Sequence, residues 1–240
     1  MMENILNLDR EFLIYLNNLG SNNWDLLWLT LTNKLTYTAF FLFVIYLIFK
    51  NFSIKQSLFI LLSIAILILL TDQFTNVIKD SFQRLRPCRD DTLNFLLRSI
   101  EVRCGKYGFF SAHASNSIAV SVFLFKLFSN NNYTVLNYFL LLWVIVFSYS
   151  RIYLGVHYPL DIIFGLIVGF VFGILSYKIA EKLILIGNTI NGTAAYAASA
   201  DATTGVIGVS VASGGTATIE ITFTQPAYAN LTSDTTVVEI

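Results

Sequence analysis

Long apolar runs separated by polar turns characterise the first 187 residues of the chain. One run extends from about Gln56 to Val77 and is long enough to cross about 30 Å of hydrocarbon as a helix. The others extend from about Trp24 or Lys34 to Phe49, Ala112 to Phe128, Val135 to Tyr149, and Leu160 to Ile186. The pattern predicts an all-α integral membrane protein, a helical bundle of about five to six transmembrane helices.

The segment from Glu3 to Leu19 has a different pattern. Its apolar residues recur at helical spacing, but charged and amide side chains lie between them. A helix with one apolar and one polar face is typical of the membrane interface. We therefore expect an N-terminal interfacial helix that precedes the bundle.

The composition changes abruptly after about Gly187. Residues 188–240 contain no Lys, Arg or His and are rich in Ala, Thr, Gly, Ser and Val. Apolar and polar residues alternate in 209–211 and 219–223, and Ser213-Gly214-Gly215 between them is typical of a hairpin turn. The sequence thus predicts a membrane-embedded domain over 1–187 and a C-terminal extension over 188–240 that is either β-rich or disordered.

Composition supports the membrane assignment. Hydrophobic residues make up 55% of the chain and charged residues 12%, with a mean hydropathy of +0.66. An ordinary soluble domain has about 25% charged residues. The formal net charge is zero and no basic run occurs, so nothing in the sequence indicates nucleic-acid binding.

Both cysteines, Cys88 and Cys104, fall in one polar stretch that runs from Lys79 to Phe110. They are too few for a zinc site. In an oxidising compartment they can form a disulfide that closes a loop of about 17 residues and contributes about 3 kcal/mol. In a reducing compartment they would be two free thiols.

Five spans would place this polar stretch and the turn around Arg151 on the same side of the membrane. The opposite side would then carry a set of lysines, which the positive-inside rule assigns to the cytoplasm: Lys50, Lys55, Lys126, Lys178 and Lys182. The stretch from Lys79 to Lys106 itself contains seven Lys or Arg. That count opposes this orientation unless several of the seven belong to a site.

His157 and Asp161 are four residues apart at the start of the last span, so a helix beginning near Tyr158 brings them to one face. A carboxylate bonded to one ring nitrogen fixes the tautomer and leaves the other nitrogen free to attack. Arg151 precedes His157 by six residues and offers a planar fork of donors suited to phosphate oxygens. Ionisable groups at a membrane boundary are costly and usually functional.

Two further polar stretches face the same side. Lys79 and Arg86 add two cations, and Ser111 and His113 lie at the start of the apolar run that ends at Phe128. Several cations and a helix start around one dianion can stabilise a phosphoryl group in transfer. Taken singly, each residue also has a structural explanation: Lys79 and Arg86 as interface cations, Ser111 as a helix cap, Asp161 as the partner of a nearby arginine.

These residues resemble the signature of the type 2 phosphatidic acid phosphatase superfamily, membrane lipid phosphatases related to vanadium haloperoxidases. The signature is Lys, six residues, Arg-Pro; then Pro-Ser-Gly-His; then Ser-Arg, five residues, His, three residues, Asp. Lys79 to Pro87 and Ser150 to Asp161 match the first and third parts in full. Phe-Ser-Ala-His at 110–113 stands for the second part and keeps its serine and histidine. The resemblance covers about residues 10–187.

The resemblance implies that His157 attacks phosphorus to form a phosphohistidine, that Asp161 orients it, and that His113 protonates the leaving oxygen. It also implies that neither a metal nor another cofactor takes part. The residues implied to hold the phosphoryl oxygens are Lys79, Arg86, Ser111 and Arg151.

We therefore expect a metal-independent phosphatase acting on a lipid phosphate or pyrophosphate: undecaprenyl pyrophosphate, phosphatidylglycerophosphate, phosphatidic acid or a lipid A phosphate. The alternatives are a lipid phosphotransferase that uses the same phosphohistidine, and a membrane binding protein without enzymatic activity. The expected location is a bacterial inner membrane, with the active site on the periplasmic or outer face. Gly165, Gly169 and Gly173 form a small-residue stripe that favours close helix packing, within the bundle or in a homodimer.

Overall fold

The computed structural model describes residues 2–93, 95–98, 100–129, 133–190, 198–200 and 207–209. The chain divides into two compact units, Met1–Glu181 and Lys182–Ile240. The division lies close to the change of composition at about Gly187. All of the predicted site residues belong to the first unit.

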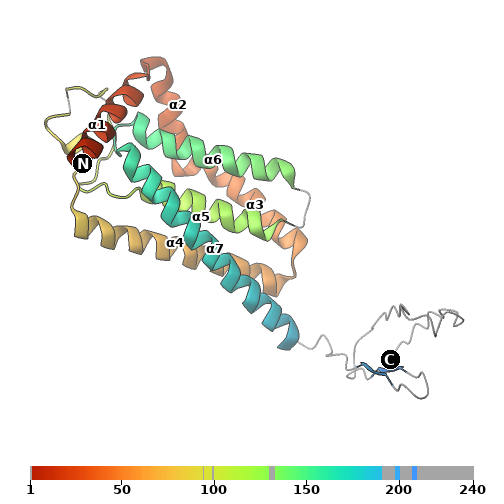
Figure 1. Ribbon diagram of the computed structural model, residues 1–240. Coiled ribbons are helices and arrows are strands. Elements are labelled where there is room, and N and C mark those ends of the chain that lie inside the picture. Colours follow the sequence, from red (N-terminus) through yellow and green to blue (C-terminus); the bar gives the residue numbers. More distant parts are fainter. Residues whose placement is uncertain are drawn as a thin grey trace, which may run out of the picture. The chain divides into compact units, whose positions relative to one another are not determined.

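The first unit is a helical bundle (Figure 1). The helices that the sequence predicts are all present, and their ends differ from the predicted ends by a few residues. The α-helices of the chain are α1 (Met2–Asn18), α2 (Asn22–Thr32), α3 (Thr38–Asn51), α4 (Ile54–Phe82), α5 (Ala112–Leu127), α6 (Thr134–Tyr153) and α7 (Pro159–Ile190), and the 3-10 helices are η1 (Lys34–Tyr37) and η2 (Pro87–Arg89).

Three of the described helices are long and apolar enough to cross a membrane: α4, α6 and the Pro159–Leu183 part of α7. A fourth span would have to combine Asn22–Thr32 with Leu35–Asn51, which are bent by 66°. At the bend the Asn33 side chain accepts a hydrogen bond from the Leu35 amide and begins η1. Because the first apolar run is broken there and α5 has 16 residues, the predicted count of five to six spans is too high.

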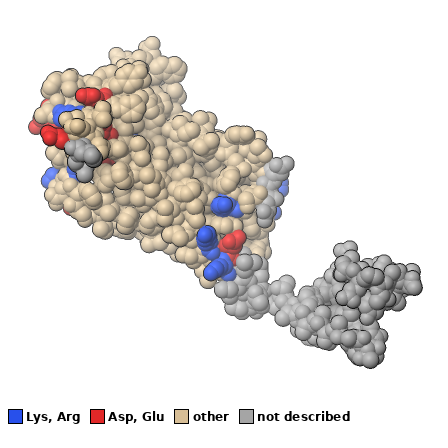
Figure 2. All heavy atoms as spheres, viewed as in Figure 1, with Lys and Arg blue, Asp and Glu red and all other residues tan. Residues whose placement is uncertain are grey.

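The surface of the first unit suits a lipid environment. On the face drawn in Figure 2, charged side chains gather at the two ends, and the band between them is uncharged. Large apolar side chains of α4, α6 and α7 are exposed, among them Leu62, Leu69, Leu142 and Ile167. An apolar surface of this extent would be unfavourable in water and is favourable in hydrocarbon.

α5 is the central helix of the bundle. It packs between α4 and α6 (Figure 1), and half of its side chains are buried. α7 approaches it through the glycine stripe. A Cβ added at Gly165 would lie 2.7 Å from the Ser111 carbonyl oxygen, one at Gly173 would lie 2.6 Å from that of Ala119, and one at Gly169 would collide with the α5 backbone. Of the two predicted uses of this stripe, the structure shows the packing within the bundle.

α1 turns its apolar face outward, as expected of a helix at the membrane interface. Four of its apolar side chains are 45–64% exposed: Ile5, Leu8, Phe12 and Tyr15. By contrast, Asp9, Leu13 and Asn17 recur every fourth residue and are buried against the bundle. The inward face of α1 therefore carries two polar side chains.

In the second unit the structure describes strands β1 (Ala198–Ala200) and β2 (Ile207–Val209), which pair antiparallel with Ser199 opposite Gly208. The hairpin predicted from 209–211 and 219–223 lies outside the described residues, apart from Val209. Neither strand carries a residue of the predicted site.

Candidate active site

A short turn joins α6 to α7 and carries His157. α6 ends at Tyr153, and Gly155 follows with a φ of +62°, a conformation that glycine adopts without strain. The amides of Gly155 and the next residue form hydrogen bonds of 2.9 and 3.0 Å to carbonyls of the last helical turn, which is the pattern of a Schellman motif. α7 then begins with Pro159, whose fixed φ suits the first helical position. Local backbone chemistry thus fixes the position of His157.

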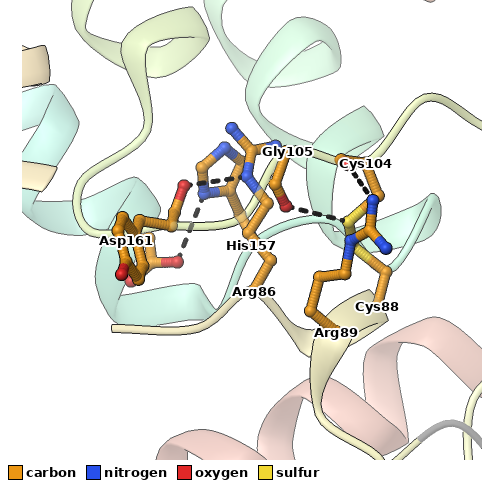
Figure 3. Close-up of a disulfide and its surroundings, with 8 residues drawn as sticks. Arg86, Cys88, Arg89, Cys104, Gly105, His157 and Asp161 are labelled. Atoms are coloured by element: carbon orange, nitrogen blue, oxygen red, sulfur yellow. Dashed lines mark hydrogen bonds and ion pairs between the residues drawn. A yellow bond between two sulfur atoms is a disulfide. The ribbon is translucent and has the colours of Figure 1, made fainter. Parts of the chain in front are cut away.

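The start of α7 holds Asp161 against His157. Asp161 is the third residue of the helix, and its Oδ2 accepts a hydrogen bond from the Tyr158 amide (3.1 Å), as the N3 side chain of a capping box does. The same oxygen lies 3.2 Å from Nδ1 of His157 (Figure 3). The exposed fractions of the two side chains are 1% for His157 and 0% for Asp161. The four-residue spacing therefore does bring the two groups together, although His157 lies just before the helix.

Burial lowers the pKa of His157 to about 4, because desolvation disfavours the imidazolium. The hydrogen bond and the charge of Asp161 act in the opposite direction, while Arg86 and Lys79 reinforce the lowering. His157 is therefore neutral near pH 7. When its Nδ1–H is donated to Asp161, Nε2 keeps a free lone pair.

Two of the predicted cations reach this histidine from α4 and the loop after it. Lys79 lies in the last turn of α4, and Arg86 follows the helix by four residues. Arg86 donates from Nε to the Tyr107 carbonyl (3.0 Å) and from its backbone amide to the Lys106 carbonyl (3.1 Å). Figure 3 shows the Arg86 side chain beside His157. Both cations are near enough to oppose protonation of His157.

The loop that carries Arg86 is closed by a disulfide between Cys88 and Cys104, whose Cα atoms are 6.5 Å apart. Arg89, next to Cys88, donates from Nη2 to the Cys104 carbonyl (2.9 Å) and lies beside the disulfide in Figure 3. A crosslink reduces the freedom of the unfolded loop and so favours the folded one. The disulfide therefore supports the segment that presents Arg86 to the site.

Ser111 is fully buried and is the N-cap of α5. Its Oγ accepts a hydrogen bond from the Ala114 amide (3.4 Å), and its own amide donates to the main-chain oxygen of Asp161 (3.0 Å). The structure thus gives Ser111 the capping role that was its structural explanation. Its amide is bonded to Asp161, so it is not an additional donor for phosphate. The next amides of the first turn have no partner within the helix.

His113, in the first turn of α5, and Arg151, in the last turn of α6, share one aromatic neighbour. The His113 ring centroid lies 5.3 Å from that of Phe147, and Arg151 Cζ lies 5.6 Å from the same ring centroid. Arg151 is 6% exposed and donates to Ser150 Oγ (3.1 Å) and to Thr32 Oγ1. Burial, and then the charges of the three cations, lower the pKa of His113 to about 3. The predicted residues of four helices therefore converge at one end of the bundle.

The site combines two imidazoles, a buried carboxylate and three cations, an arrangement suited to a dianionic phosphate. Among the residues that the structure describes, no group of three or more His, Cys, Asp or Glu could hold a metal ion. Two residues outside the signature, Arg84 and Asp9, also reach the site. Arg84 lies 3.0 Å from Asp161, and Asp9 lies 2.6 Å from Arg84. The sequence signal for Asp9 was its spacing from Asn17: the two residues lie two helical turns apart, so they put polar side chains on one face of α1.

The chain is similar to known proteins in sequence and in fold. The model of the PAP2 superfamily matches residues 56–185. The chain is 34% identical over 188 residues to a lipid A 4′-phosphatase of Bacteroides thetaiotaomicron, covering 76% of this chain and 81% of the relative. It is 32% identical over 180 residues to a lipid A 4′-phosphatase of Porphyromonas gingivalis, covering 74% of this chain and 75% of the relative.

A crystal structure of a transmembrane PAP2-type phosphatidylglycerolphosphate phosphatase from Bacillus subtilis has the same fold. It matches with a TM-score of 0.55 and 21% identity, over 74% of this chain and 87% of that chain. The family model matches more than half of the residues, and both sequence relatives match over about three quarters or more of their own length. The chain therefore belongs to the PAP2 superfamily, as an integral membrane phosphatase.

Proposed function

We propose that this phosphatase removes a phosphate from a lipid A-type lipid, without a metal, through a phosphohistidine formed on His157. The observation that carries the proposal is the buried pair in which Oδ2 of Asp161 lies 3.2 Å from Nδ1 of His157. This pair leaves Nε2 of a neutral imidazole as the nucleophile.

In the first step Nε2 of His157 attacks phosphorus, so that the N–P bond forms and the P–O bond to the lipid breaks. Asp161 stabilises the positive charge that develops on the ring, because its carboxylate accepts Nδ1–H. The bound phosphate dianion favours the protonated form of His113, which gives its proton to the departing lipid oxygen. The charge that develops on the phosphoryl oxygens is stabilised by Lys79, Arg86 and Arg151.

In the second step a water molecule attacks the phosphorus of the phosphohistidine. His113, now neutral, takes a proton from this water, the N–P bond breaks, and inorganic phosphate leaves. Each histidine returns to its starting protonation state. A lipid hydroxyl in place of the water would give phosphotransfer, so the two reactions share the first step.

Two observations support a lipid substrate. Two relatives more than 30% identical to this chain are named lipid A 4′-phosphatases. The site also lies where α4 and α6 end and where α5 and α7 begin, at one charged end of the bundle. A headgroup phosphate at the membrane boundary could enter there while the acyl chains stay in the hydrocarbon.

We also propose that the site faces the periplasm from a bacterial inner membrane. The disulfide supports this orientation, because disulfides persist in oxidising compartments. The seven Lys or Arg between Lys79 and Lys106 oppose this orientation by the positive-inside rule, but four of them have other roles. Lys79 and Arg86 lie at the site, and Arg84 and Arg98 form ion pairs with aspartates. The opposite ends of the helices carry Lys50, Lys55, Lys126 and Lys178.

Thiol labelling of the protein in bacterial spheroplasts tests the orientation. Cys88 and Cys104 should react with a membrane-impermeant maleimide only after treatment with an impermeant reductant, and cell lysis should not be needed. Lys126→Cys in a Cys88→Ser/Cys104→Ser background is the control and should be labelled only after lysis. The reverse pattern would show that the site faces the cytoplasm.

Phosphate release by the purified protein in detergent with EDTA tests the function. The substrates are lipid A with a 4′-phosphate, phosphatidic acid, phosphatidylglycerophosphate and undecaprenyl pyrophosphate. We expect the highest kcat/KM with lipid A, and a loss of several orders of magnitude in His157→Ala, because the nucleophile is gone. Arg103→Gln, which removes an exposed cation of the same loop, is the control and should keep activity.

Release that persists in folded His157→Ala would contradict the phosphohistidine. Another lipid at the top of the ranking would contradict the proposed substrate class. Phosphate that appears on a second lipid, and not in solution, would identify a phosphotransferase.

The neutral state of the buried His157 imidazole makes the folding stability of the protein depend on pH. Its pKa is lowered from 6.5 to about 4, so between these values the unfolded chain binds a proton that the folded chain does not. Stability from this group is therefore lost as the pH falls below about 6.5. We expect Tm to fall more between pH 7.5 and pH 5 for the wild type than for His157→Asn, in which residue 157 has no titrating group. Parallel decreases in the two proteins would mean that His157 is not neutral in the fold.

A further inference from the structure

The interfacial helix α1 carries a buried carboxylate that the proposed mechanism does not use. Asp9 is 5% exposed, although Leu8 beside it is 64% exposed. A carboxylate is buried at this cost only when a charged or hydrogen-bonding partner compensates for the lost water. The partners of Asp9 therefore indicate what it does.

Arg84 connects Asp9 to the proposed catalytic carboxylate. Its Nη2 lies 2.6 Å from Oδ2 of Asp9, and its Nη1 lies 3.0 Å from Oδ1 of Asp161. The guanidinium also lies over the ring of Tyr158, with Cζ 3.9 Å from the ring centroid. A planar guanidinium with two separate Nη groups can bond two carboxylates at once, which a lysine ammonium does with much less directional control.

Asp9 holds the start of α7 as well. Its Oδ1 accepts a hydrogen bond from the Leu160 amide (2.8 Å), one of the first-turn amides that have no partner within their own helix. Leu160 precedes Asp161 directly. One carboxylate of α1 therefore fixes both the backbone beside Asp161 and the arginine bonded to its side chain.

Asn17, two turns further along α1, holds the other side of the same turn. Its Nδ2 donates to the carbonyls of Ile152 (3.2 Å) and Tyr153 (2.7 Å) at the end of α6, and its Oδ1 accepts from the Arg98 amide (2.8 Å). α1 thus bonds to the helix ends on both sides of the segment that carries His157.

We propose that Asp9 and Arg84 are positioning residues: the α1 carboxylate and the guanidinium fix the rotation of the Asp161 side chain, so that its Oδ2 faces Nδ1 of His157. The inference deepens the proposed function and rests on it. Oδ1 of Asp161 is taken by Arg84, which leaves Oδ2 for the imidazole. Without the guanidinium held from α1, the carboxylate could rotate, and the tautomer of His157 would no longer be fixed.

Steady-state kinetics with lipid A and Tm measurements on Asp9→Asn and Arg84→Lys test the proposal. Each variant should lower kcat by about tenfold and change KM by less than about threefold, because phosphate binding by the other cations is kept. Asp9→Asn should have little further effect in an Asp161→Asn background, because it acts through Asp161. Two controls are Glu11→Gln, an exposed carboxylate of α1, and Asp25→Asn, which breaks the ion pair with Arg98.

Asp25→Asn measures the cost of losing an ion pair between the N-terminal helices and the loop. It should lower Tm but leave kcat within about twofold of the wild type. The proposal is overturned if folded Asp9→Asn or Arg84→Lys keeps the wild-type kcat. It is also overturned if the variants change KM alone, or if the Asp9→Asn loss persists in full in the Asp161→Asn background.

Nitrogen-15 NMR of the histidine side chains gives a readout that needs no turnover. The chain has two histidines, so labelled histidine yields two imidazoles to assign. The wild type and Asp25→Asn should show His157 as a single Nδ1–H tautomer, and Asp9→Asn should show a mixture of tautomers. An unchanged tautomer in both Asp9→Asn and Arg84→Lys would overturn the positioning role. By contrast, absence of phosphate release by the wild type would overturn the proposed function.

Discussion

The carboxylate of Asp161 is the group on which the active site depends. Its Oδ2 contacts Nδ1 of His157 and the Tyr158 amide, and its Oδ1 contacts Arg84. The main-chain oxygen of the same residue accepts a hydrogen bond from the Ser111 amide. These contacts join the start of α7 to the cap of α5 and to the loop after α4. A fully buried charge is stable only with such partners, so the same contacts that orient His157 also stabilise the fold around it.

Close packing of the helices makes these contacts reachable. Ser111 can meet Asp161 because α7 approaches α5 through glycines, and a side chain at Gly165 would collide with the Ser111 carbonyl. Likewise, the αL glycine at 155 lets the chain turn sharply between α6 and α7 and return to the bundle. The apolar outer surface faces lipid, whereas the interior uses small residues and polar contacts, as membrane bundles do.

The sequence predicted what depends on local spacing. The apolar runs predicted the helices, and the four-residue spacing predicted the contact between His157 and Asp161, because both are properties of neighbouring residues. Contacts between distant segments were not predictable in this way: Arg84 and Asp9 are 75 residues apart, and nothing in either segment indicates the other. The first apolar run was predicted to begin at about Trp24 or Lys34, and the break at Asn33 agrees with the second of these starts. The capping role of Ser111 was predictable from its local sequence, whereas the bond of its amide to Asp161 of another helix was not.

We propose that His157 carries the phosphoryl group during turnover. The most direct measurement is to mix the protein with phosphorus-32-labelled lipid A, quench the reaction in alkaline detergent, and locate the label by peptide mass spectrometry. We expect a label on the peptide that contains His157. The label should be stable in alkali, lost in mild acid as expected of a phosphohistidine, and absent from His157→Ala. Turnover that proceeds with no labelled protein, or a label on any residue other than His157, would contradict it.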